Sequence, residues 1–341
     1  MTSTPRRAVP PVVVKAAVRL IVWAAVVVLA WYLVRALRRV DWPAVGDAIA
    51  HLAWWQVAVL LLLVVARAAL SSTPLALFTE GLGLRRAIGN DLVGNLAATV
   101  TPAPADIVAR AAMFRAWGVD VGQGMAGLVL NSILYYVVRL AAPVAGAVLM
   151  LWTVGEEGAV GWAAVLSGLA SAAIVAVLVV GSRSATSAGA VGRVLGRVAH
   201  RVRRTLPRPE QMEKTVVEFH ARVAARWLRH WPAALLSLTG MVVVESTILV
   251  LALRFVGVPP SQAPTLVVVA CFLSVYLLMA TPFLGLGVLD AAVVALVSMH
   301  TPAQASDLVA GLVVWRVAVQ LVPLAAGVVP LLSVRRSRPT P

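Results

Sequence analysis

Thr281-Pro282-Phe283-Leu284-Gly285-Leu286-Gly287-Val288-Leu289-Asp290 is the stretch that decides the fold. It follows an apolar run at 263–279, which places it at the depth of a lipid bilayer. Pro282 lacks a backbone donor, Gly285 and Gly287 weaken helical order, and an ionised Asp290 near the bilayer centre costs about 2.5–3.5 kcal/mol. Broken backbone persists at that depth only where protein or a polar cavity surrounds it. We therefore interpret this stretch as half of a substrate site.

A second stretch has the same character. In Thr101-Pro102-Ala103-Pro104-Ala105-Asp106, the prolines Pro102 and Pro104 break the helix before an acid, and Arg110 follows one turn later. Each stretch precedes a long apolar segment that carries one arginine and then a proline, Arg139 with Pro143 and Arg316 with Pro323. Interrupted hydrophobic segments at corresponding positions of two halves are typical of a transporter site. The sequence thus indicates an internal repeat.

The composition is that of a polytopic membrane protein. Of 341 residues, 61% are hydrophobic and only 13% are charged, and several apolar runs are long enough to cross a bilayer. The net charge of +15 gathers in one connecting segment and at the termini. Cytoplasmic orientation and anionic lipid explain that charge better than nucleic acid does. A lone Cys271 and scattered histidines favour neither a disulfide framework nor a metal site, and we expect no cofactor.

The expected architecture is an all-α polytopic membrane helix bundle of about eight spans in two pseudo-repeated halves. Residues 1–180 form the N-terminal membrane half, with an uncleaved first span near 15–34 and a re-entrant hairpin at about 91–114. Residues 181–231 form a basic, amphipathic cytoplasmic linker. Residues 232–341 form the C-terminal half, with a broken segment at about 281–299. Positive charge places both termini in the cytoplasm.

Ionisable residues within the apolar runs are the candidate substrate-binding groups. The acids are Asp106, Glu245 and Asp290, and the bases are Arg67, Arg110, Arg139 and Arg316. One interpretation is that they form ion pairs that lock helices together. The other is that the arginines hold a phosphate bidentately, while the acids orient them or bind a cationic headgroup or a proton. In the second case Asp106, Asp290, Arg139 and Arg316 should surround one cavity.

Motifs for nucleotide hydrolysis and metal-dependent or serine hydrolysis are missing from the sequence. It contains no phosphate loop, no His-Glu-x-x-His and no Gly-x-Ser-x-Gly. These absences lower the expectation of catalysis without excluding an intramembrane enzyme.

Three segments resemble a known family. The run Asn95…Thr101-Pro102-Ala103-Pro104-Ala105-Asp106…Arg110, followed by Phe114-Arg115-Ala116-Trp117-Gly118, resembles the "Asn…Pro-x-x-Gly-acid…Arg" segment of the lysylphosphatidylglycerol synthase membrane region, or flippase-like domain family. The 281–290 stretch resembles its "Pro-Gly-Gly-x-Gly-x-x-Glu" segment. Val314-Trp315-Arg316…Leu321-Val322-Pro323…Gly327 resembles its closing "Tyr-Arg…Leu-Pro…Gly" helix. The resemblance covers roughly 15–333.

The chain departs from the family pattern at several positions. Ala105 replaces a glycine, Phe283 and Leu284 replace part of a glycine pair, and Asp290 replaces a glutamate. Asn131 and Ser132 stand where a Glu-Arg pair is common. These departures put the substrate in doubt, although a carboxylate is kept at both broken stretches.

The resemblance implies a multi-pass plasma-membrane lipid translocator. In the best-understood relatives the membrane module is joined to a cytosolic aminoacyl-transfer domain, and this chain, which ends at Pro341, lacks one. We therefore expect a stand-alone translocator of an anionic, glycosylated or aminoacylated phospholipid or a polyprenyl-linked lipid. The alternatives are a membrane-embedded transferase with a lipid-phosphate donor, with Asp106 or Asp290 as its base, and a scaffold for envelope lipid synthesis. Expected partners are phospholipids or lipid-linked saccharides, anionic headgroups at the linker, and a second copy or a lipid-modifying enzyme, but no nucleic acid.

Overall fold

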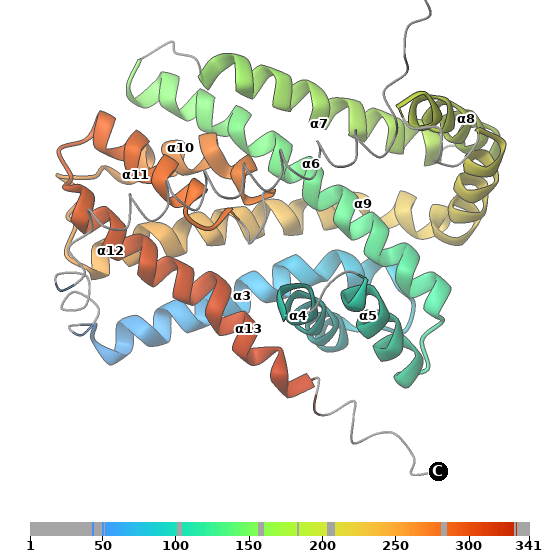
Figure 1. Cartoon of the computed structure of the whole chain (residues 1–341), viewed down its shortest axis with the longest axis horizontal. Coiled ribbons are helices and arrows are strands. Elements are labelled where there is room, and N and C mark those ends of the chain that lie inside the picture. The colour runs from blue at the N-terminus through green and yellow to red at the C-terminus, as the bar shows by residue number, and fades with distance from the viewer. Residues whose placement is uncertain are drawn as a thin grey trace, which may run out of the picture.

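The computed structural model of the chain describes residues 52–330, with gaps at 101–103, 156–159, 183, 203–208 and 281–284, and also residues 43, 50 and 332. The predicted first span and the helix-breaking Pro102 and Pro282 lie outside the described residues. Within these bounds the protein is helical and has no strand (Figure 1). Its elements are α3 (Trp54–Phe78), α4 (Leu84–Val100), α5 (Ala105–Ala116), α6 (Val121–Thr153), α7 (Val160–Ser182), α8 (Ala185–Val202), α9 (Pro209–Phe255), α10 (Thr265–Val275), the 3₁₀ segment η1 (Tyr276–Ala280), α11 (Val288–His300), α12 (Ala305–Arg316), the π-helical segment η3 (Val317–Leu321) and α13 (Val322–Ala326).

Four helical stretches of the described chain are long and apolar enough to cross a membrane. They are Trp54–Phe78, Val121–Thr153, Arg226–Phe255 and Ala305–Pro330. Three shorter apolar helical stretches accompany them, at Ala164–Val180, Thr265–Ala280 and Val288–His300. The predicted all-α membrane helix bundle is thus confirmed, whereas the count of about eight spans stays a prediction.

The antiparallel pair α3 and α9 is the spine of the bundle (Figure 1). At one end Arg226 donates to the carbonyl of Leu77, and at the other end the rings of Trp55 and Phe255 meet edge to face at 5.4 Å. Helix α9 runs from the basic linker into the bundle without a break, so the boundary predicted at 231 falls inside a helix. The two predicted halves also interlock, because α3 packs on α9 and α6 packs on α10.

Two broken helical hairpins enter the bundle from opposite ends. Helices α4 and α5 lie between the end of α3 and the start of α6, where Arg86 stacks over the ring of Trp117 at 6.0 Å. Helices α10 and α11 lie between the end of α9 and the start of α12, at the opposite end of the spine (Figure 1). In each hairpin the two helices are separated by one of the stretches singled out by the sequence, since α4 ends at Val100 before α5 begins at Ala105, and η1 ends at Ala280 before α11 begins at Val288.

Close helix contacts hold the second hairpin in place. A Cβ added to Gly146 of α6 would lie 2.4 Å from the backbone nitrogen of Ser274, so only glycine lets α6 approach α10 this closely. The ring of Phe272 packs edge to face against Tyr276 and Trp315, each at 5.4 Å. These fully buried aromatics join α10, η1 and α12 around the second broken stretch.

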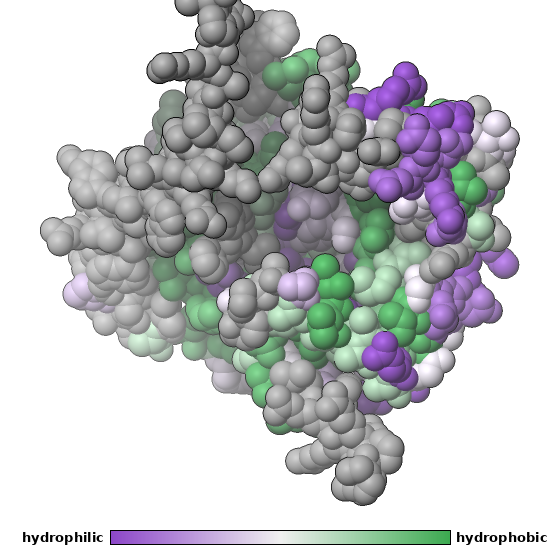
Figure 2. All heavy atoms as spheres, turned by 45° about the vertical axis from the view of Figure 1, so that its right-hand side comes forward, coloured by the Kyte–Doolittle hydropathy of each residue, from purple (hydrophilic) through white to green (hydrophobic). Residues whose placement is uncertain are grey.

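Helix α8 lies across the N-terminal part of α9, at the end of the spine marked by Arg226. It is strongly amphipathic, and Arg193 on its exposed side pairs with Glu213 of α9. Figure 2 shows hydrophilic side chains gathered on this side of the molecule, next to a hydrophobic surface.

Candidate functional site

Asp290 and Arg316 form an ion pair across the second broken stretch. Gly287, with φ +79°, turns the chain into α11, and its N–H donates to Asp290 Oδ2 at 2.7 Å. Arg316 Nε donates to Asp290 Oδ1 at 2.9 Å, and its Nη2 donates to the Gly285 carbonyl at 3.2 Å. The carboxylate therefore caps a helix N-terminus, where negative charge is favoured, and also fixes the arginine.

Arg316 ends α12 immediately before the π-helical segment η3. Its guanidinium lies 4.9 Å from the ring centroid of Trp315, and Nη1 donates to Gln320 at 3.4 Å. Single-turn π segments occur frequently at functional sites because they re-aim side chains out of the helical register. Here the arginine is aimed at the break in the neighbouring hairpin.

Glu245 is the most deeply buried acid of the site. It is 0% exposed, and its carboxylate accepts from Arg67 Nη2 at 3.4 Å and from the Tyr276 hydroxyl at 2.8 Å. Its backbone carbonyl accepts from Trp315 Nε1 at 3.2 Å. Since Trp315 directly precedes Arg316, the two ion pairs belong to adjoining parts of one network.

Arg139 joins this network through an aromatic side chain. Its guanidinium lies 4.3 Å from the ring centroid of Tyr135 and donates to the Tyr135 hydroxyl at 3.2 Å. Tyr135 also lies near Arg67 and Tyr276. The network thus contains five of the seven ionisable residues proposed from sequence, namely Arg67, Arg139, Glu245, Asp290 and Arg316.

The remaining two residues, Asp106 and Arg110, lie on α5 in the first hairpin and are not bonded to each other. Arg110 donates to Asp91 at 3.3 Å and to Asn90 at 3.3 Å, both on α4. Gly94 makes room for it, because a Cβ there would lie 1.9 Å from Arg110 Nε. Among the described residues Asp106 has no hydrogen bond or ion pair, so the expected grouping of Asp106 with Arg139, Asp290 and Arg316 is not seen in their contacts.

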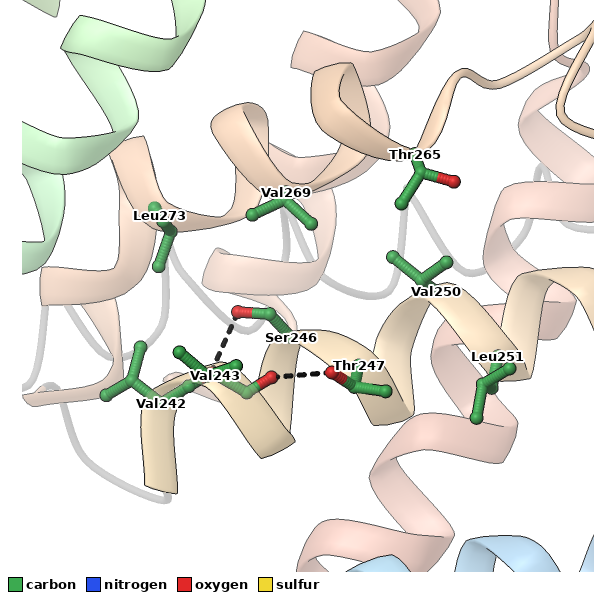
Figure 3. A pocket seen from close by; sticks show the side chains of 9 residues that line it. All are labelled: Val242, Val243, Ser246, Thr247, Val250, Leu251, Thr265, Val269 and Leu273. Carbon is green, nitrogen blue, oxygen red and sulfur yellow. Dashed lines mark hydrogen bonds between the residues drawn. The ribbon is translucent and has the colours of Figure 1, made fainter. Parts of the chain in front are cut away.

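An apolar groove lies beside the network, between α9 and α10 (Figure 3). Its volume is about 230 Å³, and it is lined by Val242, Val243, Ser246, Thr247, Val250, Leu251, Thr265, Val269 and Leu273. Ser246 and Thr247 donate to carbonyls of their own helix, at 2.9 and 2.8 Å, which satisfies their hydroxyl hydrogens. The groove is therefore suited to a hydrocarbon chain. Separately, no group of three metal-ligating side chains is found in the described chain.

Sequence reasoning missed several polar partners. Tyr276 lies in an apolar run. Its role could have been predicted because a buried tyrosine hydroxyl needs a hydrogen-bond acceptor, and Glu245 is the buried acid that supplies one. Tyr135 is a second such residue, because its hydroxyl accepts from Arg139 one turn away on the same helix. Asp91 is a third, because it is the ion-pair partner of Arg110.

The comparison with known families agrees with this architecture. The family model of the Lysylphosphatidylglycerol synthase TM region matches residues 22–327, which include both hairpins and the whole polar network. No significant match was found among curated proteins or among solved structures. The chain is a multi-pass membrane protein that belongs to the family of the lysylphosphatidylglycerol synthase transmembrane region.

Proposed function

We propose that this protein is a translocator that moves a phospholipid headgroup across the plasma membrane. Its family fits a membrane lipid-related role. The observation that carries the proposal is the buried network of three arginines and two acids beside the second interrupted hairpin. Ionisable groups this deep in membrane helices are costly and typically mark a substrate path.

The two hairpins support a path with two openings. One hairpin carries the Asp91–Arg110 pair and the other carries the Asp290–Arg316 pair, and they enter from opposite ends of the bundle. Repeats of this kind allow a central site to open to one side or the other. In this mechanism the phosphate exchanges one arginine for the next, while the acids keep the arginines oriented when no headgroup is bound.

The apolar groove between α9 and α10 supplies a place for an acyl chain. The groove adjoins the polar network, because its lining residue Ser246 directly follows Glu245 in α9. A lipid would therefore keep its tail against Val242, Val250 and Val269 while its headgroup lies in the polar network. Groove and network together match an amphiphile better than a soluble anion.

The transferase alternative requires a carboxylate that is free to act as a base. Both oxygens of Asp290 already accept hydrogen bonds, which makes it a poor base. Asp106 is the remaining candidate, since it has no partner in the described part of the chain. A covalently changed lipid in cells that express the protein, absent when Asp106→Asn is expressed, would favour this alternative.

The direct test uses purified protein in vesicles that contain fluorescent phosphatidylglycerol, with a membrane-impermeant quencher added outside. We expect more label to become accessible than in empty vesicles, and at least a tenfold slower rate for Arg316→Gln, about 1.4 kcal/mol. The matched control is Arg115→Gln on the exposed end of α5. Rates equal to empty vesicles for every lipid class tested would refute translocation.

A further inference from the structure

Arg139 is a buried cation without a counter-ion in the described structure. Arg139 is only 6% exposed, and within the described residues its side chain donates its only hydrogen bond to the neutral hydroxyl of Tyr135. Its Nε has no hydrogen-bond partner. A guanidinium remains protonated in proteins, so it cannot escape the cost of burial by losing its proton. Among the described residues no anion offsets the charge of Arg139, so its surroundings favour a bound anion.

The buried side-chain atoms without a partner in the described chain all belong to two helices that pack on each other, α3 with the residue that follows it and α6. These atoms are Arg67 Nε, Ser72 Oγ and Thr79 Oγ1 from α3 and its end, and Asn131 Oδ1 and Arg139 Nε from α6. The helices run antiparallel there, since Gly127 lies against Thr79 while Tyr135 lies near Arg67. Buried polar groups are normally satisfied. Five exceptions on two contacting helices point to a bound polar group.

The net charge of Arg67, Glu245 and Arg139 indicates how much negative charge the bound anion carries. Arg67 and Glu245 neutralise each other, so Arg139 leaves the cluster with one positive charge. A phosphodiester carries one negative charge, whereas a phosphomonoester carries about −1.5 to −2 near pH 7. The unused Nε donors of the two arginines are of the kind that binds phosphate oxygens.

We propose that Arg67 and Arg139 bind the phosphodiester of a singly anionic lipid between α3 and α6. This inference rests on the proposed translocation and names its headgroup chemistry and docking position. The polar atoms of Asn131, Ser72 and Thr79 continue from this position toward the end of the spine that carries Arg226. They give the headgroup a polar route along the same interface.

The test measures thermal unfolding of the full chain in detergent, with dihexanoylphosphatidylglycerol as the probe. The probe should stabilise the wild type, and dihexanoylphosphatidylcholine should do so less because its ammonium group repels the arginines. Arg139→Met should unfold at a higher temperature than the wild type when no probe is present, because a buried unpaired charge is removed. It should bind the probe at least tenfold more weakly, whereas the exposed-site control Arg115→Met should bind normally.

A structural role for Arg139 predicts the opposite sign. An Arg139→Met protein that is less stable without probe, or that fails to fold, would overturn the assignment. Arg139→Lys keeps the charge but not the planar fork, and we expect it to fold and to bind about tenfold more weakly. Binding of the probe by Arg139→Lys as tightly as by the wild type would also overturn it.

Inorganic phosphate separates the two sources of the anion. Stabilisation by inorganic phosphate equal to that by the short-chain lipid would contradict a lipid site. If short-chain lipid stabilises the wild type but not Arg139→Met while vesicles show no lipid movement, the site stands and translocation fails. If vesicles show movement that Arg139→Met leaves unchanged, the site assignment alone fails.

Discussion

Each buried acid in this protein offsets the cost of burying its charge by accepting hydrogen bonds from two donors. Asp290 caps α11 with one oxygen and holds Arg316 with the other, and Glu245 accepts from both Arg67 and Tyr276. Breaking a buried pair leaves the surviving charge uncompensated, which is more damaging than removing both charges together. The same logic makes Arg139 conspicuous, since no acid pairs with it in the described chain.

The Asp290–Arg316 pair should show this coupling in a double-mutant cycle. Asp290→Asn and Arg316→Gln should each lower the unfolding free energy, and the double variant should lose less than the sum of the two. The expected coupling is about 0.5–3 kcal/mol, measured by reversible unfolding in detergent or bicelles. Strict additivity would mean that the pair makes no energetic contact.

Gly94 should matter because it leaves room for the Arg110 guanidinium beside Asp91. In Gly94→Ala the new methyl would overlap the guanidinium, which lies at the end of a flexible side chain and can move away from Asp91. Because alanine also favours a helix over glycine, we expect the unfolding free energy to be about 1 kcal/mol lower than that of the control variant below, and lipid movement to be slower. Gly240→Ala is the matched control, because its Cβ would lie 3.6 Å from Leu70 in ordinary contact. Equal effects of the two substitutions would contradict this role.

At the scale of helices, these residues are positioned by breaks within helices and by close contacts between helices. Positive-φ Gly285 and Gly287 turn the chain into α11, while the π-helical segment after Arg316 shifts the following residues out of the α-helical register. Glycine also brings whole helices together, as Gly146 does for α6 and α10. The second hairpin is thus held by its neighbours rather than by its own helix-forming tendency.

Gly146→Val should therefore separate α6 from α10. Backbone atoms of Leu273 and Ser274 lie 2.8 and 2.4 Å from the position that a Cβ would take, and they cannot rotate away as a side chain could. We expect destabilisation of about 1–3 kcal/mol or more, measured as a lower unfolding temperature in detergent. Gly240→Val on α9, beside Leu70, tests the general cost of valine in a helix. A similar loss in both variants would attribute the effect to helix propensity.

At the scale of the whole molecule, the two ends of the bundle differ in charge. The end marked by α8 carries an exposed group of basic residues, namely Arg85, Arg86, Arg115, Arg193, Arg197, Lys214 and Arg229. Basic residues next to membrane spans favour the cytoplasmic side, where they also attract anionic lipid. We therefore expect α8 in the cytoplasm and the α11–α12 connection outside.

Cysteine labelling tests this orientation. In a Cys271→Ala background, Lys214→Cys should react with a membrane-impermeant maleimide only after permeabilisation. Gln304→Cys, in the exposed connection before α12, should react in intact cells. The reverse pattern would invert the orientation, and labelling of both sites from one side would contradict the antiparallel path of α9 and α12.

The sequence by itself determined the class of protein, the helical breaks and the residues that hydrocarbon would reject. Apolar runs are local, and so is the effect of a proline or a positive-φ glycine, so the long helix at Val121–Thr153 and both broken stretches follow from nearby residues. The buried arginines and acids could be identified for the same reason, since the cost of placing each one in a membrane depends on its own side chain.

Only the tertiary structure decided which charges meet. Arg67 and Glu245 are 178 positions apart, and no periodicity in the sequence relates them. Arg110 pairs with Asp91 rather than with the acid one turn away on its own helix, because α4 approaches through Gly94. Arg139 contacts Tyr135 one turn away on its own helix, and helix packing brings no acid of the described chain within ion-pair distance of it. Pairing depends on helix packing, which arises from the fit of many side chains at once and is not encoded in any short segment.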